Sequence, residues 1–345
     1  MSIKQLRITT AGLCLALAGL AQAGMGFTEL AGPQDDGLVT VFYPSAGDGE
    51  RVQMGTYSLQ LDRHGPPVRG NGRLIVMSHG SGGSPWTYTD LARSLVDDGF
   101  VVALPRHRGD NYTDPSSPGP DSWRQRPAEV SRAIDAVARD PRFAPLLALD
   151  KVGMYGMSAG GHTALSLAGG RWSPAQLARH CEAHIAEDFH TCVGLTTRLT
   201  GGMFDGLKKT VSLFVIRQKF SDSTWQVHAE PRIRAVVAAV PLAADFDMAS
   251  LAAPRVPLGL VTAQQDQWLI PQFHSAQVLQ ACKTCELLAD LPTGGHGAVL
   301  SPPPPLDKLS PIARDLLLGP PGFDRGELPA VYRKITAFMR RHLLP

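Results

Sequence analysis

The sequence predicts an α/β fold in which helices cover both faces of a mostly parallel central sheet. Short apolar runs recur along the chain, as in strands that are buried on both faces of a parallel sheet. Segments with a helical spacing of apolar residues lie between these runs, which is the pattern of repeated strand–helix–strand units. The chain has 345 residues, of which 43% are hydrophobic, so we expect one domain with a large core.

The predicted sheet starts in the first third of the chain. Residues 38–43 and 57–61 flank a turn-rich segment and predict an antiparallel hairpin at the sheet edge. Residues 73–80 form an apolar run that ends in a glycine-rich loop, and Ser84 followed by a proline predicts a helix start there. Residues 101–105 are the next expected strand.

The middle of the chain contains one long irregular stretch. A helix is expected from about Pro127 to Asp140, and residues 151–156 form an apolar strand that leads into a helix of small residues. Residues 170–231 lack this pattern and are too many for a simple connection, so we predict an insertion that lies over the sheet. Three strands and a final helix are expected after it: 233–241, 256–262, 286–292 and 328–344.

The amino terminus has the features of an export signal. Lys4 and Arg7 precede an apolar run over residues 11–20, and Ala21-Gln22-Ala23 is a small-x-small cleavage sequence. The run is too short for a stable membrane span. We therefore expect a signal peptide over residues 1–23, a mature domain over residues 24–345, and a periplasmic or secreted location. An uncleaved anchor or a buried helix is the alternative.

Four cysteines remain once this signal is removed, an even number in a compartment that permits disulfides. Three pairings are open, and we favour the two local ones, Cys181 with Cys192 and Cys282 with Cys285. The second pair ends a predicted helix and precedes a strand, whereas redox-active pairs open a helix. We therefore expect a structural role for it.

The segment around the first pair also contains three histidines, His180, His184 and His190. Together with Cys181 and Cys192 they are a conceivable zinc site. A disulfide-closed segment with surface histidines is the favoured interpretation, because an exported chain tends to oxidise its cysteines. The sequence therefore predicts no metal.

One serine lies in a sequence motif that can expose a nucleophile. Gly156-Met157-Ser158-Ala159-Gly160 fits G-x-S-x-G, a sharp turn between a strand and a helix that exposes a serine hydroxyl. The glycines are expected because a side chain at their positions would collide with the neighbouring strand or helix. An ordinary turn is the alternative, but the apolar strand before the motif and the small-residue helix after it favour a nucleophile.

A serine nucleophile needs a base and a carboxylate that orients the base. Asp266 follows one predicted strand and His296 follows the last, in the required order of acid and then histidine. Asp245 and Asp247 follow the preceding strand and compete for the acid role, because neighbouring strand ends lie only about 5 Å apart. We favour Asp266.

The remaining requirement is a pair of donors for the oxyanion. The backbone N–H groups of Ala159 and Ser81 are the candidates, since Ser81 lies in the glycine-rich loop after the strand that ends at residue 80. His79 is expected to brace this loop. Four aromatic residues near the same loops either line an acyl pocket or pack in the core: Trp86, Tyr88, Trp268 and Phe273.

With these residues placed, the chain resembles the α/β-hydrolase superfamily, and within it the bacterial predicted dienelactone hydrolases that are similar to platelet-activating factor acetylhydrolases. The resemblance implies a Ser158-Asp266-His296 triad and no cofactor. The similar acetylhydrolases take their acid from the earlier strand end, so Asp245 and Asp247 remain open. Dienelactone hydrolases proper have a cysteine nucleophile, which this chain lacks. The matching segments are FYP (42–44), MSHGSGG (77–83), VVALPRHRGDN (101–111), YGMSAGGHTALSLAGG (155–170), QQDQWLIP (264–271) and GGHG (294–297).

The sequence thus predicts an exported serine hydrolase that cleaves a small-molecule carboxylic ester. A lactone, a phospholipid-type acetyl ester, a polyester or an amide is the alternative substrate, and a catalytically silent binding protein on the same fold is the alternative class. The formal net charge is only +2, and no basic block is interleaved with aromatic residues, so we expect no nucleic-acid partner.

Overall fold

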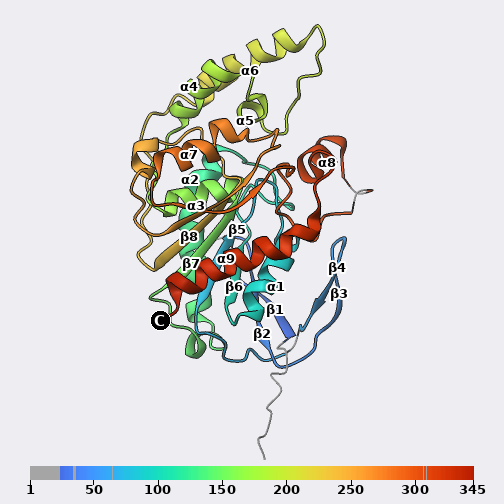
Figure 1. Cartoon of the computed structure of the whole chain (residues 1–345), viewed down its shortest axis with the longest axis vertical. Coiled ribbons are helices and arrows are strands. Elements are labelled where there is room, and N and C mark those ends of the chain that lie inside the picture. Colours follow the sequence, from blue (N-terminus) through green and yellow to red (C-terminus); the bar gives the residue numbers. More distant parts are fainter. Residues whose placement is uncertain (1–23, 34–35, 64, 306, 308) are drawn as a thin grey trace, which may run out of the picture.

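The chain forms an eight-stranded central sheet with strand order β1-β2-β6-β5-β7-β8-β9-β10 (Figure 1). The computed structural model describes residues 24–33, 36–63, 65–305, 307 and 309–345; the predicted signal peptide, residues 1–23, lies outside them. The six strands from β6 to β10 are parallel, whereas β1 and β2 are antiparallel to their neighbours. The strands are β1 (Gly24–Leu30), β2 (Val39–Ser45), β5 (Leu74–Ser78), β6 (Val101–Pro105), β7 (Val152–Met157), β8 (Ile233–Ala239), β9 (Leu258–Ala263) and β10 (Glu286–Leu291).

Helices cover both faces of this sheet, as predicted. Alternate residues of a strand point to opposite faces, and β5 shows this directly. Ile75 and Met77 belong to the core shared with α1 and α9, whereas Leu74 and Val76 belong to the core shared with α2 and α3. The helices are α1 (Thr89–Asp97) and α9 (Leu328–Leu343) on one face, and α2 (Pro120–Arg139) and α3 (Ala159–Leu167) on the other. The predicted α/β class with a mostly parallel sheet is confirmed.

The predicted hairpin between residues 38–43 and 57–61 is wrong. β2 pairs instead with β1 and β6. Every residue of β2 is buried, so this strand needs a neighbour on each edge, and β1 supplies one. The second segment, β4 (Tyr57–Leu61), pairs with β3 (Glu50–Met54) in a separate two-stranded sheet. Gly55, with φ of +60°, reverses the chain directly between these two strands.

Two helices near the site differ from those predicted from the sequence. α2 begins at Pro120 rather than at about Pro127, and Pro127 lies inside it. A proline inside a helix costs about 3 kcal/mol. Trp123 and Arg126, in the turn before Pro127, are both buried, so this part of the helix packs against the body of the protein. The second helix, α8 (Pro311–Leu318), was not expected at all.

The stretch predicted as an insertion, residues 170–231, contains three helices that lie together at the top of Figure 1. They are α4 (Pro174–His184), α5 (Phe189–Val193) and α6 (Asp205–Lys219). A disulfide between Cys181 and Cys192 joins α4 to α5. A second disulfide joins Cys282, at the end of α7 (Ser275–Ala281), to Cys285 before β10. Both local pairings are therefore confirmed.

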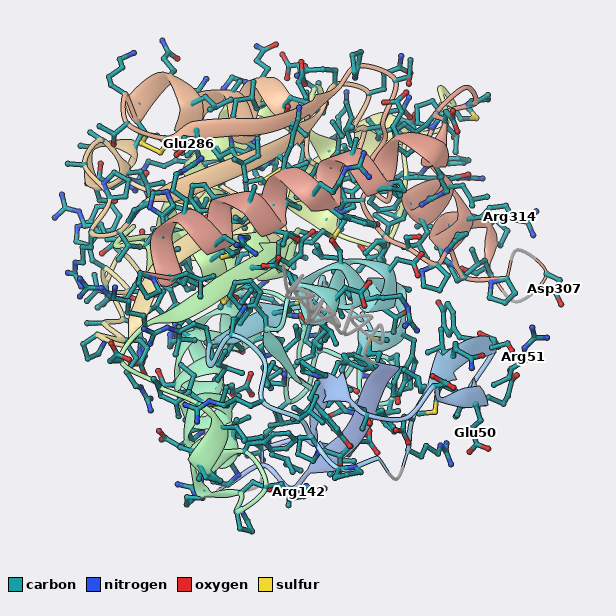
Figure 2. All side chains as sticks on the ribbon, turned by 60° about the horizontal axis from the view of Figure 1, so that its bottom comes forward. Glu50, Arg51, Arg142, Glu286, Asp307 and Arg314 are labelled. Carbon is teal, nitrogen blue, oxygen red and sulfur yellow. A yellow bond between two sulfur atoms is a disulfide. The ribbon has the colours of Figure 1, made fainter. Side chains whose placement is uncertain are left out.

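The β3–β4 hairpin and α8 lie on the same side of the molecule. Figure 2 shows this arrangement through Glu50 and Arg51 of the hairpin and through Arg314 of α8. Both elements contribute to one cleft, which is described below. Within the described part of the chain, every helix is too short or too polar to cross a bilayer.

Candidate active site

Ser158 lies in a sharp turn between β7 and α3. Its φ of 59° and ψ of −120° are sparsely populated by residues other than glycine. A Cβ at Gly156 would lie 1.9 Å from the carbonyl oxygen of Gly160, and a Cβ at Gly160 would lie 1.9 Å from that of Ser78. Only glycine fits at these positions, so the predicted reason for the two glycines is confirmed.

The structure brings Ser158, His296 and Asp266 together at the carboxyl ends of β7, β10 and β9. Nε2 of His296 lies 2.9 Å from Oγ of Ser158, and Nδ1 lies 2.7 Å from Oδ2 of Asp266. Both His296 and Asp266 are only 4% exposed. A carboxylate oxygen only accepts, so the bond to Asp266 assigns the ring proton of His296 to Nδ1. Nε2 is then free to accept the proton of the Ser158 hydroxyl.

The carboxylate of Asp266 is itself held by the backbone. Its Oδ1 atom accepts hydrogen bonds from the N–H groups of Trp268, at 2.8 Å, and Leu269, at 2.9 Å. The other oxygen therefore stays directed at His296. Fixed donors of this kind keep the carboxylate in the orientation that its histidine partner requires.

The competing carboxylates point elsewhere. Asp245 is fully buried, and its Oδ2 atom lies 3.0 Å from Nε2 of His162. Asp247 forms an ion pair with Arg171 and accepts a hydrogen bond from the N–H of Ala249. The structure therefore places Asp266 against His296 and gives Asp245 and Asp247 other partners.

The two amides predicted to bind an oxyanion both lie at the cleft that contains Ser158. Ala159 is the first residue of α3, where helix N–H groups lack partners within the helix. The described residues supply no hydrogen-bond acceptor to the N–H of Ser81 or of Ala159. A Cβ at the neighbouring Gly80 would lie 3.4 Å from the Cβ of Ser158, so the loop runs beside the serine.

A buried ion pair that was not predicted from the sequence lies beneath this loop. Arg126 is fully buried, and its Nη2 atom lies 2.8 Å from Oδ2 of Asp110. Oδ1 of Asp110 accepts from the hydroxyl of Ser81, at 2.6 Å, and from the N–H of Gly82, at 2.9 Å. Burial opposes ionisation of Asp110, but Arg126 and these donors outweigh it and lower its pKa. The pair thus ties the loop to α2.

His79 braces the same loop, as predicted. Its Nδ1 atom donates to the carbonyl of Gly80, at 2.7 Å, and its Nε2 atom accepts from the N–H of His107, at 3.3 Å. Nη1 of Arg126 donates to the carbonyl oxygen of His79. Complete burial lowers the pKa of His79, so the neutral ring matches its one donated and one accepted bond.

A second arginine missed from the sequence holds the loop of His296. Arg325 donates from Nη1 to the carbonyls of Ala298 and Leu300. It donates from Nη2 to the carbonyls of Gly297 and Leu317. The last of these belongs to α8, so one guanidinium joins the histidine loop to the carboxyl-terminal part of the chain. Such contacts between distant segments leave no signal in sequence spacing.

Ser158 and His296 open into a cleft of about 1830 Å³. Its walls come from the loop after β5, the β3–β4 hairpin, α8 and the helices of residues 170–231. Trp86, Tyr88 and Trp268 line it, although all three are also mostly buried in the core. Phe273 is not among the lining residues; its ring packs against those of His180 and His184.

The possible zinc site is not formed. Cys181 and Cys192 are bonded to each other, and Nε2 of His180 lies 2.8 Å from Oδ2 of Asp188. Among the residues that the structure describes, no group of three or more His, Cys, Asp or Glu side chains could hold a metal ion.

The same region instead joins the inserted helices to the loop of Asp266. Asp188 is buried and lies 3.1 Å from Nε2 of His274, besides its bond to His180. The hydroxyl of Thr191 donates to the carbonyl of Trp268, at 3.2 Å. The ring of His190 stacks on Trp268 with centroids 4.0 Å apart. The inserted helices are therefore anchored two residues from the carboxylate that holds His296.

The arrangement as a whole can make a serine hydroxyl nucleophilic. A base within hydrogen-bond reach, oriented by a fixed carboxylate, is what such activation requires. Two N–H groups at the same cleft can take the developing negative charge. Comparison with protein-family models and with curated proteins finds no match to this chain, so its chemistry is inferred from this geometry.

Proposed function

We propose that the protein is a serine hydrolase of the α/β-hydrolase type that cleaves carboxylic esters. The observation that carries the proposal is the continuous hydrogen-bonded chain from Asp266 through His296 to Ser158. The positions of these residues at three strand ends and the strained turn at Ser158 support it. The resemblance of the sequence to bacterial dienelactone hydrolase-like proteins agrees with it.

In the proposed reaction, Oγ of Ser158 attacks the ester carbonyl while Nε2 of His296 takes the hydroxyl proton. The N–H groups of Ser81 and Ala159 hold the oxyanion, and Asp266 stabilises the imidazolium. His296 then gives its proton to the leaving alcohol, which leaves an acyl group on Ser158. Water, deprotonated by His296, releases the carboxylic acid and restores the hydroxyl. No step draws on a cofactor.

We further propose that the protein acts outside the cytoplasm. The amino-terminal pattern of residues 1–23 predicts export, and the two disulfides fit an oxidising compartment. Cytosolic thiol chemistry keeps most such pairs reduced.

A panel of p-nitrophenyl esters with increasing acyl length tests the proposed activity. We expect turnover that Ser158→Ala lowers by at least about a thousandfold while leaving the unfolding temperature nearly unchanged. The acyl length that is cleaved fastest will report how much of the cleft the acyl chain fills. Absence of turnover by the wild-type protein across the panel, and on lactone and amide substrates as well, would favour a silent binding protein.

A further inference from the structure

A second serine, histidine and carboxylate are hydrogen-bonded in series beneath the candidate active site. Oγ of Ser78 lies 2.7 Å from Nε2 of His107, and Nδ1 of His107 lies 2.5 Å from Oε2 of Glu129. Ser78 and His107 are fully buried, and Glu129 is 3% exposed. Neither these two residues nor Glu129 line the cleft. The series, called the Ser78–His107–Glu129 chain below, is therefore sealed from substrate, and its role lies in what it holds in place.

The Ser78–His107–Glu129 chain fixes His107 on both sides of its ring. Complete burial lowers the pKa of His107, so the ring is neutral and needs one acceptor and one donor, which the chain supplies. Oε1 of Glu129 also accepts from the N–H of Arg108, at 3.1 Å, and the side-chain amide of Asn111 donates to the carbonyl of His107, at 2.7 Å. The ring of His107 and the peptide group that follows it are therefore both held.

The backbone of His107 in turn selects the tautomer of His79. The N–H of His107 lies 3.3 Å from Nε2 of His79, and the two ring centroids are 4.8 Å apart. A backbone N–H only donates, so Nε2 of His79 accepts and the proton of this ring is at Nδ1. Nδ1 lies 2.7 Å from the carbonyl oxygen of Gly80, which only accepts. Both contacts thus require the same tautomer.

The bond to Gly80 determines where the N–H of Ser81 points. The carbonyl of Gly80 and the N–H of Ser81 belong to one planar trans peptide group, so they point in opposite directions. The N–H of Gly83 donates to the same carbonyl, at 3.0 Å, which gives it a second fixed donor. With the carbonyl held on one side, the N–H of Ser81 faces the other way. A reversed peptide would present the carbonyl oxygen of Gly80 to the oxyanion and repel it.

We propose that Glu129 and His107 are positioning residues that aim the N–H of Ser81 at the oxyanion. They act through His79 and the carbonyl of Gly80. The inference rests on the proposed hydrolysis, in which Ser81 is one of the two oxyanion donors. Loss of one such donor typically costs roughly 10²–10³-fold in kcat. Because the Ser78–His107–Glu129 chain does not line the cleft, breaking it should lower kcat and leave substrate binding nearly unchanged.

Steady-state kinetics on one ester, with two variants of the chain, tests the proposal. Glu129→Leu removes the carboxylate partner of the His107 ring, and Ser78→Ala removes the hydroxyl at its other nitrogen. Glu129→Leu should lower kcat by at least about tenfold and change KM by less than about twofold. Wild-type kcat in the folded variant would overturn the proposal. If Glu129→Leu does not fold, Ser78→Ala decides by the same criterion.

Glu230→Leu is the matched control for Glu129→Leu. Glu230 is also a mostly buried glutamate, and it pairs with Arg232 before the amino end of β8, whereas the site lies at the carboxyl ends of the strands. Arg232 also bonds to Asp135 of α2, so the control disturbs the same helix without touching His107. Glu230→Leu should lower the unfolding temperature and keep the wild-type kcat. An equal loss of kcat in the two variants would overturn the proposal, because lost stability would then explain both.

A trifluoromethyl ketone separates this proposal from the hydrolysis on which it rests. Oγ of Ser158 adds to the ketone carbon, the hydroxyl proton passes to His296, and the ketone oxygen becomes an oxyanion like that of the reaction. The wild-type protein should bind this ketone far more tightly than the methyl ketone with the same chain. Equal binding of both by the wild type would contradict the hydrolysis itself.

The same two ketones then report on the position of the N–H of Ser81. Glu129→Leu should lose affinity for the trifluoromethyl ketone by the same factor by which it loses kcat, and it should bind the methyl ketone as the wild type does. A variant that keeps the full wild-type preference for the trifluoromethyl ketone would overturn the positioning role and leave the hydrolysis standing.

Discussion

Nε2 of His296 lies 2.9 Å from Oγ of Ser158, although 138 positions separate the two residues in the chain. They meet because β7 and β10 are parallel strands of one sheet, so their carboxyl ends reach the same edge. The loop after β9 brings Asp266 to the other side of the imidazole. The proposed activity depends on this three-residue contact.

The identity of the acid can be tested with paired variants. Asp266→Asn should lower kcat by roughly 10³–10⁴-fold, because an amide cannot stabilise the imidazolium or hold the required tautomer. Asp245→Asn and Asp247→Asn should each lower kcat by less than about tenfold, since Asp245 is bonded to His162 and Asp247 to Arg171. Steady-state kinetics on one ester suffices. A larger loss at Asp245 or Asp247 than at Asp266 would show that the acid is misassigned.

The loop that carries the proposed oxyanion donor should depend on its hydrogen bonds to Asp110. Ser81→Ala keeps the backbone N–H but removes the hydroxyl bond to Oδ1 of Asp110. A hydrogen bond to a charged group is worth about 1.5–3 kcal/mol, so a misplaced N–H should lower kcat by about tenfold with little change in KM. Asp110→Asn should have a larger effect.

Ser84→Ala, in the same loop, is the matched control for Ser81→Ala, because Oδ1 of Asp110 bonds to Ser81 and Gly82, and the Ser84 side chain does not cap the helix that follows it. If kcat is unchanged in Ser81→Ala while its unfolding temperature falls, the bond serves stability alone.

Arg325 should hold the His296 loop in place. Arg325→Met removes four bonds to backbone carbonyls, which are then left partly unpaired. We expect a loss of about 2–4 kcal/mol in the free energy of unfolding and a lower kcat. Denaturant unfolding and kinetics measure the two effects. Arg333→Met, at an exposed position of α9, should change neither.

The network around Asp188 predicts a pH-dependent contribution to stability. Burial opposes ionisation of Asp188, but the bonds from His180 and His274 outweigh it and lower its pKa. A lowered folded-state pKa stabilises the protein fully above the unfolded value, near 3.9, and the stabilisation is lost as the pH falls through the folded value. Asp188→Asn should therefore destabilise the protein strongly at pH 7 and progressively less below about pH 4.

Thermal unfolding of both proteins between pH 7 and pH 3 measures this difference. Glu187→Gln, at the neighbouring exposed position, is the matched control and should follow the wild type throughout. A difference between Asp188→Asn and the wild type that stays constant over this range would contradict the assignment.

Patterns within one segment made part of the fold predictable. The apolar runs of β5, β6, β7 and β9 are buried throughout, so their hydrophobicity alone identified them. Gly156 and Gly160 followed from the steric needs of a tight turn. β1 was missed because it begins beside the predicted cleavage site, and β3 because its exposed charged residues hide the strand pattern.

Contacts between distant segments were not predictable in the same way. Ser158, Asp266 and His296 could be proposed together because each follows a strand in a known order. Arg126 and Asp110 come from a helix and a loop, and Arg325 reaches its carbonyls from beyond α8. Nothing in residue spacing reports such pairs, since their partners are set by how the elements pack.

Covalent labelling shows whether Ser158 is the activated nucleophile. A fluorophosphonate reacts with a serine only when a base activates the hydroxyl and the site holds the oxyanion. We predict that intact-mass and peptide mass spectrometry will find one adduct on the wild-type protein, located at Ser158, and that His296→Ala will slow its formation by at least about a hundredfold. A wild-type protein that stays unlabelled, or an adduct on another serine, would contradict the proposed nucleophile.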